Sequence, residues 1–418
     1  MSLRVLILSA DIGEGHNTAA RALAQGLRRR GAVVHVDEHL ESLSAAQRLA
    51  LREGSRLLFR HAPWAFGAYY RLLLRSRTAR ALARASLVRF GARPMLRMID
   101  RHRPDVIVST YPATTVVLGE LRRRGAVRAP VVATITDVTG LFFWAAPRID
   151  LHLVSWRESI EEVLTIAPGS DVRHVAGLTD RVFQRPRSKR EARTALGLAA
   201  DRPVVVVSGG GWGVGDLAGA ACAALAVPGA QVIVAAGRDP AVRARLERRI
   251  GAAAGLHVLG FTDRMSDLLA AADVLVHATG GVTCLEARLR GCPVVLYGFA
   301  VGHVRHNAVA MERLGLSLRA RRPAELTAAI VRILQEPAPN ARPCGALPSA
   351  ANAVMTARAL DLAPVPVRRA PSRVRGRVAV AALVGALVVA GFAQTAPGDA
   401  IADHARLHVH SVLVAPIR

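Results

Sequence analysis

Short aliphatic runs recur along the first half of the chain, and each is followed by a stretch with helical periodicity. The runs cover residues 5–8, 32–36, 105–109, 131–135 and 150–154. Continuous apolar runs of this length are typical of strands that are buried on both faces, as in parallel sheets. Their alternation with helices predicts a Rossmann-like α/β domain over residues 1–185.

The same pattern begins again after a polar, broken stretch at residues 186–202. Further aliphatic runs predict a second Rossmann-like domain over residues 186–345, and they cover residues 203–208, 256–260, 274–276 and 293–297. A chain of 418 residues has room for two domains of ordinary size. We therefore predict an α/β fold in which two Rossmann-like domains face a cleft, with ligands at the carboxyl ends of the strands.

The carboxyl-terminal part of the chain changes character. Residues 346–377 are rich in proline and arginine and are predicted to be a linker, whereas residues 378–393 carry no charge. This run is shorter than the roughly 20 residues of a typical span, and a buried helix is the alternative, but the flanking residues favour a hydrophobic helix that anchors the chain in a membrane. Arginines precede the run and almost none follows, which predicts cytoplasmic catalytic domains and a short tail, residues 394–418, outside the cell membrane.

The overall composition is strongly basic. The chain has 56 basic against 31 acidic residues, a formal net charge of +25, and Lys189 is its only lysine. Arginine suits phosphates on lipids, nucleotides or nucleic acids, although a compositional bias of the genome would produce the same excess. The four cysteines (Cys222, Cys284, Cys292 and Cys344) lack the spacing of a metal site or a disulfide framework, so we expect no metal and a reducing compartment.

Arginine is concentrated between residues 44 and 103, and part of it recurs every four residues. Two stripes are formed by Arg48, Arg52, Arg56 and Arg60 and by Arg89, Arg93, Arg97 and Arg101. Aromatic residues lie between the stripes. Arginine beside aromatic rings is typical of a surface that binds an anionic membrane, and the residues predicted to do so are Arg56, Arg60, Trp64, Tyr69 and Tyr70. A solvated helix face packed by an aromatic cluster is the alternative, and the lack of a nucleic-acid motif argues against that partner.

The first strand leads into a glycine loop with Gly13 and Gly15, and then into a helix that Asn17 or Thr18 can cap. Strand, glycine loop and helix start form an anion site in many proteins. His16 stands where this helix begins. A helix amino terminus disfavours the imidazolium form, so His16 is a candidate general base, with a capping role as the alternative and Asp137 as a competing base.

The second half has two glycine loops of the same kind. Gly209, Gly210 and Gly211 follow a strand, but no acidic residue closes the next strand, which argues against NAD and favours a phosphate. The other loop contains Gly280, Gly281 and Thr283, followed one helical turn later by Glu286. Neither loop is specific when taken alone.

Taken in this order, the motifs resemble those of the processive diacylglycerol glycosyltransferases and monogalactosyldiacylglycerol synthases, which are related to the N-acetylglucosaminyltransferase that forms lipid II. The resemblance covers roughly residues 3–335. It is carried by residues 9–16 with Ala19 and Ala20, Pro63 and Trp64 with Tyr69 and Tyr70, residues 135–137 through Trp144, residues 280–283 with Glu286 and Ala287, residues 291–293, and Asn307 with Ala308.

The resemblance implies a GT-B enzyme that moves a hexose from a UDP-sugar to a membrane lipid, with inversion and without a cofactor. His16 is then the base for the acceptor hydroxyl, and Glu286 accepts hydrogen bonds from the ribose. The remaining substrate-binding positions are Gly15, Gly209, Gly210, Gly211, Gly280, Gly281, Thr283 and Asn307. Helix termini could carry the charge of the leaving group in place of a metal.

Two departures from the family pattern leave alternatives open. The family usually has Gln-Glu and a further acidic residue before the asparagine that matches Asn307, whereas this chain has His303, Val304, Arg305 and His306. A family histidine is also replaced by Leu141. The hexose is therefore not predicted. The alternatives are an isoprenoid-linked or other cell-envelope acceptor, or a non-catalytic membrane-bound sensor of sugar nucleotides.

Overall fold

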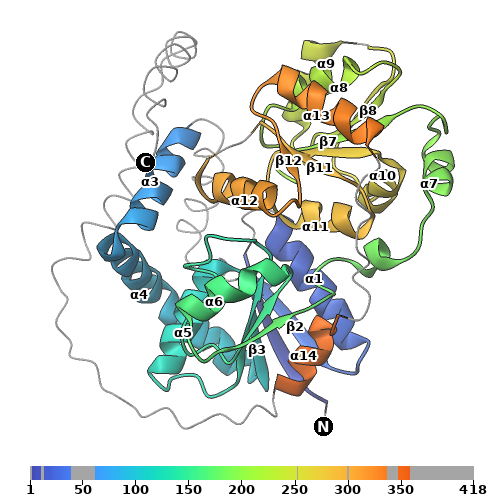
Figure 1. Cartoon of the computed structure of the whole chain (residues 1–418). Helices are drawn as coiled ribbons and strands as arrows, with labels where there is room; N and C mark the ends of the chain where they lie inside the picture. Colours follow the sequence, from blue (N-terminus) through green and yellow to red (C-terminus); the bar gives the residue numbers. More distant parts are fainter. Residues whose placement is uncertain are drawn as a thin grey trace. The chain divides into compact units, whose positions relative to one another are not determined.

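The strands form where the aliphatic runs predict them, because branched aliphatic side chains suit a pleated backbone that is buried on both faces. The structure is a computed structural model that describes residues 2–10, 14–38, 62–251, 253–298, 301–336 and 347–357. Within these ranges the strands assemble into two separate six-stranded sheets (Figure 1).

The first sheet has the strand order β2-β1-β3-β4-β5-β6, and all of its pairings are parallel. Its strands are β1 (Arg4–Ser9), β2 (Val33–Glu38), β3 (Val106–Ser109), β4 (Val131–Ile135), β5 (Leu151–Val154) and β6 (Asp171–His174). The helices of this half are α1 (Glu14–Arg28), α3 (Pro63–Arg75), α4 (Arg77–His102), α5 (Pro112–Arg123) and α6 (Ile160–Ile166), with short 3-10 turns at Arg157–Ser159 and Arg181–Gln184. The hydrophobic pattern did not predict the edge strand β6, which has a single aliphatic residue.

The second sheet has the order β12-β11-β10-β7-β8-β9 and is also parallel throughout. Its strands are β7 (Val204–Ser208), β8 (Gln231–Ala235), β9 (Leu256–Leu259), β10 (Val274–His277), β11 (Val294–Leu296) and β12 (Leu318–Arg319). The helices are α7 (Lys189–Leu196), α8 (Leu217–Leu225), α9 (Pro240–Ile250), α10 (Met265–Ala271), α11 (Val282–Leu289), α12 (Gly302–Arg313) and α13 (Pro323–Gln335). The two predicted α/β halves are therefore present.

Helices cover both faces of each sheet, as the unbroken apolar strands require. In β1, Val5 and Ile7 pack into the core beside α1, whereas Leu6 and Leu8 pack into the core beside α4 and α5. Successive side chains of a strand point to opposite faces, so each strand contributes to two cores. This arrangement fixes the sheet between two helical layers and leaves the ends of the strands open to ligands.

The strand order reverses once in each sheet. In the first sheet the reversal lies between β1 and β3, and in the second it lies between β7 and β10. Loops that leave such neighbouring strands run in opposite directions, which opens a crevice at the carboxyl edge, and ligands of doubly wound folds bind there. The topology therefore selects the loops after β1, β3, β7 and β10 as the place to look for a site.

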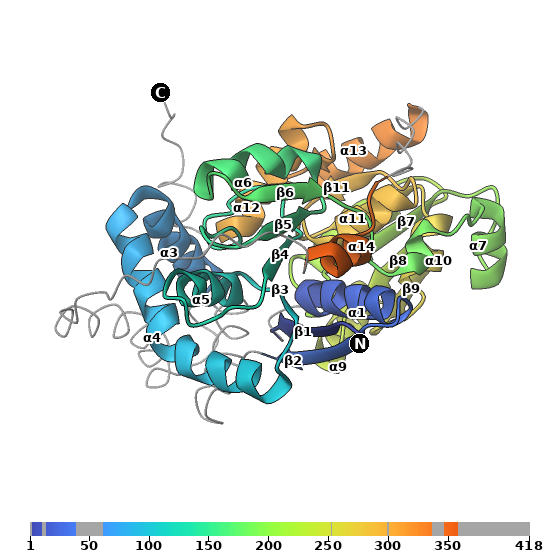
Figure 2. The same cartoon turned by 90° about the horizontal axis from the view of Figure 1, so that it is seen from below.

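The chain returns to the first half at its last described helix, α14 (Ala350–Thr356), which packs on α1 (Figure 2). A Cβ at Gly26 of α1 would lie 3.1 Å from the Cβ of Ala351, and Arg30 Nε donates to Asn352 Oδ1 at 2.5 Å. The prediction of a linker over residues 346–377 is wrong for α14, because its small apolar residues fill the core beside α1. The boundary at residues 185/186 stays a prediction.

Several predictions fall on residues outside the described ranges. They include Gly13, the arginine stripe with Arg56 and Arg60, and the hydrophobic segment 378–393 with the tail 394–418. Among the helices that the structure describes, none is both long and apolar enough to cross a membrane.

Candidate active site

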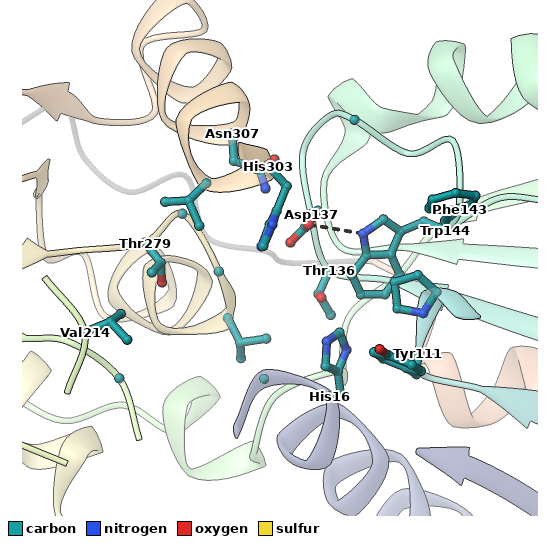
Figure 3. Close-up of a pocket in the computed structure, with 18 of the residues that line it drawn as sticks. His16, Tyr111, Thr136, Asp137, Phe143, Trp144, Val214, Thr279, His303 and Asn307 are labelled. Carbon is teal, nitrogen blue, oxygen red and sulfur yellow. Dashed lines mark hydrogen bonds between the residues drawn. The ribbon is translucent and has the colours of Figure 1, made fainter. Parts of the chain in front are cut away.

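A cleft of about 520 Å³ lies where the carboxyl edges of the two sheets face each other (Figure 3). Its walls come from both halves of the chain. The first half contributes Gly15, His16, Tyr70, Tyr111, Thr136, Asp137, Phe142 and Trp144, and the second contributes Gly209, Gly210, Gly211, Thr279, Gly280, Gly281, Thr283, Glu286, His303 and Asn307, among others. The loops selected by the two strand-order reversals are thus brought together in one site.

His16 stands in the first turn of α1, and its ring is held from two sides. Its Nδ1 lies 2.9 Å from the carbonyl oxygen of Thr110, and its ring packs against Tyr111 and Trp144 with centroids 5.0 and 5.3 Å away. A carbonyl oxygen can only accept, so Nδ1 donates and carries the proton of the neutral ring. The other nitrogen, Nε2, is then the one with a lone pair for an incoming proton.

The surroundings of His16 keep its ring neutral. Burial lowers the pKa of His16 below its ordinary value, and His303 lowers it further, while the charge of Asp137 and the carbonyl of Thr110 act in the opposite direction. The net result is a pKa below the ordinary value of histidine. At neutral pH the imidazole is therefore unprotonated, which is the form that a general base requires.

Asp137 follows β4 and is held by Trp144, whose Nε1 donates to Asp137 Oδ2 at 3.1 Å. Figure 3 shows this bond and the approach of Asp137 toward the cleft between His303 and His16. The Asp137 side chain raises the pKa of His16 through its charge but is not hydrogen-bonded to it in the described structure. Its position suits a group that stabilises an imidazolium formed during a reaction.

The two walls of the cleft differ. The first half contributes side chains to it, whereas the second half contributes backbone at the start of α11. Gly281 is the N-cap of α11, and no side chain caps this helix, so its first N–H groups are open to the cleft. Gly280 is closely packed, because a Cβ there would lie 3.1 Å from the Cβ of Asn307 and from the sulfur of Met311. A helix amino terminus with free N–H groups binds anions, and Thr283 of its first turn lines the same wall.

The glycine loop after β7 lies beside this helix start. Gly210 has φ of +70° and Gly213 has φ of +61°, a region in which side-chain-bearing residues are strained. A Cβ at Gly209 would overlap the backbone of Val214. The loop therefore folds tightly because of its glycines, and it leaves backbone at the cleft surface. On the opposite side, Gly15 brings α1 close to α11, since a Cβ there would lie 3.5 Å from Val282.

Glu286 is a buried carboxylate one turn into α11. Burial raises its pKa to about 8, with a smaller contribution from the charge of Asp180. Among the described residues its carboxylate has no hydrogen-bond partner, and it lines the cleft. A buried acceptor without donors is costly unless a ligand supplies them, and two neighbouring hydroxyl groups of a sugar would do so.

Asn307 joins the two halves. Its Oδ1 accepts hydrogen bonds from the backbone N–H groups of Val138 and Thr139, both at 3.1 Å, and the residue is 2% exposed. The same loop is held from the other side by Glu162, which accepts from the N–H groups of Gly140 and Leu141. In this structure the carbonyl oxygen of Asn307 therefore holds the loop that follows Asp137, while its Nδ2 has no partner in the described part of the chain.

Two family descriptions match consecutive parts of the chain. Residues 16–175 match monogalactosyldiacylglycerol (MGDG) synthase, and residues 202–336 match glycosyl transferases group 1. The first match spans the sheet that carries His16, and the second spans the sheet that carries Glu286.

Relatives extend these matches across most of the chain. The processive diacylglycerol beta-glucosyltransferases of Bacillus licheniformis and Bacillus subtilis are 25% and 26% identical over 337 and 339 residues, which is 79% and 80% of this chain and 87% of each relative. The solved glycosyltransferase SsfS6 of Streptomyces sp. SF2575 has a TM-score of 0.52 at 18% identity over 84% of this chain and 99% of its own, which shows the same fold. The chain is a GT-B glycosyltransferase.

The predicted GT-B fold and kind of enzyme are thus confirmed, and the hydrophobic carboxyl-terminal helix stays a prediction. Within the described ranges of the glycosyltransferase, no group of three or more histidine, cysteine or acidic side chains could hold a metal ion. The prediction that the reaction uses no cofactor is not tested by this observation.

The residues predicted to bind a membrane divide between two environments. Trp64 and Tyr69 of α3 are 67% and 46% exposed, as a surface role requires. Tyr70 is only 7% exposed and lines the cleft, so its predicted place on the membrane surface is wrong. Helical spacing explains the difference, because consecutive residues of a helix point about 100° apart.

The cleft also contains residues to which the sequence analysis gave no role in the site. Tyr111 and Thr110 fix the ring of His16, and Phe66 and His303 line the cleft from α3 and α12. The sequence predicted ligands at the carboxyl ends of the strands, which includes the loop after β3, but nothing in the pattern showed which atom this loop offers.

Proposed function

We propose that this glycosyltransferase moves a hexose from a UDP-sugar to the hydroxyl group of a membrane lipid, diacylglycerol, with inversion at the anomeric carbon. One observation supports it above all others. The lone-pair nitrogen of His16 and the uncapped start of α11 belong to different halves of the chain and line the same cleft. A base on one wall and an anion site on the other are the two groups that an inverting transfer needs.

In the proposed step, His16 Nε2 removes the proton of the lipid hydroxyl as the oxygen attacks the anomeric carbon. The bond from that carbon to the β-phosphate of UDP breaks on the opposite side, and the electron pair leaves with the phosphate. The N–H groups that begin α11 receive the charge of the leaving group. Asp137 stabilises the imidazolium that His16 becomes.

The donor is proposed to lie mainly on the second half. Its pyrophosphate would rest on Gly280, Gly281 and Thr283, with the loop of Gly209–Gly211 beside it, because these positions offer backbone N–H groups and no bulky side chain. Glu286 would accept the two hydroxyl groups of the ribose. Two O–H donors favour the charged carboxylate and would lower the raised pKa of Glu286.

An apolar arm of the cleft supports a lipid acceptor. Leu73, Leu87, Phe142 and Phe143 line the part of the cleft beside α3 and α4. Apolar side chains around a reactive hydroxyl suit a molecule whose remaining surface is hydrocarbon.

The outer surface of the same helices supports a membrane as the source of that lipid. Trp64 and Leu72, eight residues apart on α3, are 67% and 51% exposed, and Phe90 of α4 is 48% exposed. Arginines of α4 recur beside them on exposed positions, namely Arg89, Arg93, Arg97 and Arg101. Exposed aromatic rings and an exposed leucine among arginines fit a surface that rests on anionic headgroups. The catalytic halves are proposed to face the cytoplasm.

The test is a transfer assay with the full chain and vesicles of phosphatidylglycerol that contain diacylglycerol. The expected result is release of UDP from a UDP-hexose and a glycosylated diacylglycerol in the mass spectrum of the lipids. Transfer to an isoprenoid-linked acceptor but not to diacylglycerol would show that diacylglycerol is not the acceptor. Binding of the UDP-hexose without any release of UDP would identify a sensor and refute the transfer.

A further inference from the structure

Helix α3 has two faces with different surroundings. One face carries the exposed side chains Trp64 and Leu72, whereas the other carries Phe66 and Tyr70, which line the cleft. In both Figure 1 and Figure 2, α3 of the first half lies beside α12 of the second, and the two helices are in contact. The inner face of α3 therefore forms part of the wall where the halves meet.

Two glycines make room for this inner face, one from each half. A Cβ at Gly302, at the start of α12, would overlap the ring of Phe66, and a Cβ at Gly140 would overlap the hydroxyl of Tyr70. Both glycines also have positive φ, +54° and +75°. Their backbones come so close to the aromatic rings that no larger residue fits, which fixes where the Tyr70 hydroxyl lies.

The hydroxyl of Tyr70 is buried and has no hydrogen-bond partner in the described structure. Burial raises the pKa of Tyr70 above its ordinary value, and the charges of Asp137 and Glu162 add to this, so the phenol keeps its proton. It is therefore a donor without an acceptor at the wall of a cleft. Such a group costs free energy in the empty protein unless a ligand supplies an oxygen.

The neighbours of Tyr70 indicate which kind of ligand oxygen could accept a hydrogen bond from its hydroxyl. Its ring lies 5.5 Å from that of His306, 6.2 Å from that of His303 and 5.4 Å from that of Phe142, measured between centroids. Asp137 and Glu162 lie close enough to act on it electrostatically, which disfavours a phosphate or carboxylate at this place. The acceptor that fits is a neutral hydroxyl beside flat rings, and sugars offer such hydroxyls together with apolar C–H faces.

We propose that Tyr70 donates a hydrogen bond to a hydroxyl oxygen of the transferred hexose, with His303 forming the adjoining wall. This assignment rests on the proposed transfer from a UDP-sugar. The pyrophosphate is proposed to lie on α11, and the lipid on the apolar arm that extends to Leu87 of α4. The part of the wall where α3 meets α12 is then left for the hexose. The hexose subsite then contains a residue from the half opposite to the one that holds UDP.

The test compares Tyr70→Phe with the wild type and with the matched control Tyr297→Phe, in which a buried tyrosine that does not line the cleft loses the same atom. Calorimetry measures the affinity for UDP and for the UDP-hexose that the wild type consumes. We expect Tyr70→Phe to bind UDP as the wild type does and to bind the UDP-hexose about tenfold more weakly, as the loss of one hydrogen bond to a buried donor predicts. Tyr297→Phe should change neither.

Analogues of the donor that lack one hydroxyl identify the oxygen. For the analogue missing the hydroxyl that Tyr70 contacts, wild type and Tyr70→Phe should bind with equal affinity, whereas the other analogues should keep the difference. Equal affinities for UDP and for every UDP-hexose in both proteins would overturn the role of Tyr70. Parallel losses of affinity for UDP and UDP-hexose would overturn it as well, since they indicate a structural role. A wild type that neither binds nor consumes a UDP-hexose would instead reject the proposed function.

Discussion

At the carboxyl edge of the first sheet, the strands beside the reversal present side chains, His16 after β1 and Tyr111 after β3. At the matching edge of the second sheet, β7 and β10 lead into backbone, the loop of Gly209–Gly211 and the uncapped start of α11. The two halves share one topology, yet one is equipped to move a proton and the other to hold a negative charge. Topology fixes where a ligand lies, and the residues of the loops decide what happens to it.

The largest effect is expected from the removal of His16, the proposed proton acceptor of the first half. We expect His16→Ala to lower the rate of transfer by about 10²- to 10⁴-fold, the usual contribution of a general base. The affinity for UDP should be nearly unchanged, because the donor is proposed to bind to the other half. Turnover, calorimetry and melting temperature separate the cases, with the exposed His257→Ala as control. A folded His16→Ala with near-normal turnover, beside an inactive Asp137→Asn, would assign the base to Asp137.

The converse change removes Glu286, the proposed hydrogen-bond acceptor for the ribose, from the second half. Glu286→Ala should weaken UDP binding by roughly 10- to 100-fold, about 1.5–3 kcal/mol, because two hydroxyl groups lose a charged partner. Calorimetry with UDP measures the loss. Glu312→Ala removes an exposed carboxylate of the same half, paired with Arg319, and should leave UDP affinity intact. If both variants bind UDP equally well, Glu286 is not in the donor site.

A smaller effect is expected where the halves are joined. Asn307→Ala leaves the buried N–H group of Val138 and the partly buried N–H group of Thr139 without their acceptor. An unsatisfied buried donor costs about 1–3 kcal/mol. We expect turnover to fall about tenfold, since the loop carries Asp137, and UDP affinity to change little. Asn307→Asp keeps the acceptor oxygen and should restore most of the turnover. Asn352→Ala, which loses one exposed bond on α14, is the control, and unchanged turnover in Asn307→Ala would contradict the link.

The smallest effect is expected from a change of pH, which acts on a buried histidine in each half. Each sheet buries a histidine whose pKa burial lowers to about 4, His152 in β5 and His277 in β10. The unfolded chain binds these protons near pH 6.5, so the folded state loses stability as the pH falls from about 6.5 toward 4. The melting temperature should be level above pH 6.5 and decline below it. A melting temperature that stays constant down to pH 5 would show that these rings are not held neutral.

Much of the fold follows from the hydrophobic pattern, because strands buried on both faces leave an unbroken apolar signal. The edge strand β6 and the helix α14 lack such a signal. Strand β6 pairs through its backbone on one side only. Helix α14 is a run of small residues that resembles a linker in the sequence, and only its packing in the core beside α1 shows that it is a helix of the fold.

The candidate site was predictable as a set of loops and less so as a set of roles. His16, Glu286 and the glycines stand at helix starts, where sequence spacing alone suggests contact with an anion or a base. The burial of Tyr70 depends on how α3 meets α12, and the bonds of Asn307 depend on a loop 169 residues away in sequence. Contacts between the halves leave no local pattern in the sequence, so the burial of Tyr70 and the hydrogen bonds of Asn307 could not be predicted from it.

The return of α14 to the first half has a practical consequence for engineering. The chain passes from the first half to the second after β6, and α14 packs on the first half again. The first half is therefore not one continuous segment. A chimera that exchanges residues 1–185 with those of a relative would place a foreign α1 under the native α14, with Gly26 and Ala351 no longer matched. Donor-binding halves should therefore be exchanged as an internal cassette that ends before residue 347, so that α14 stays with the α1 on which it packs.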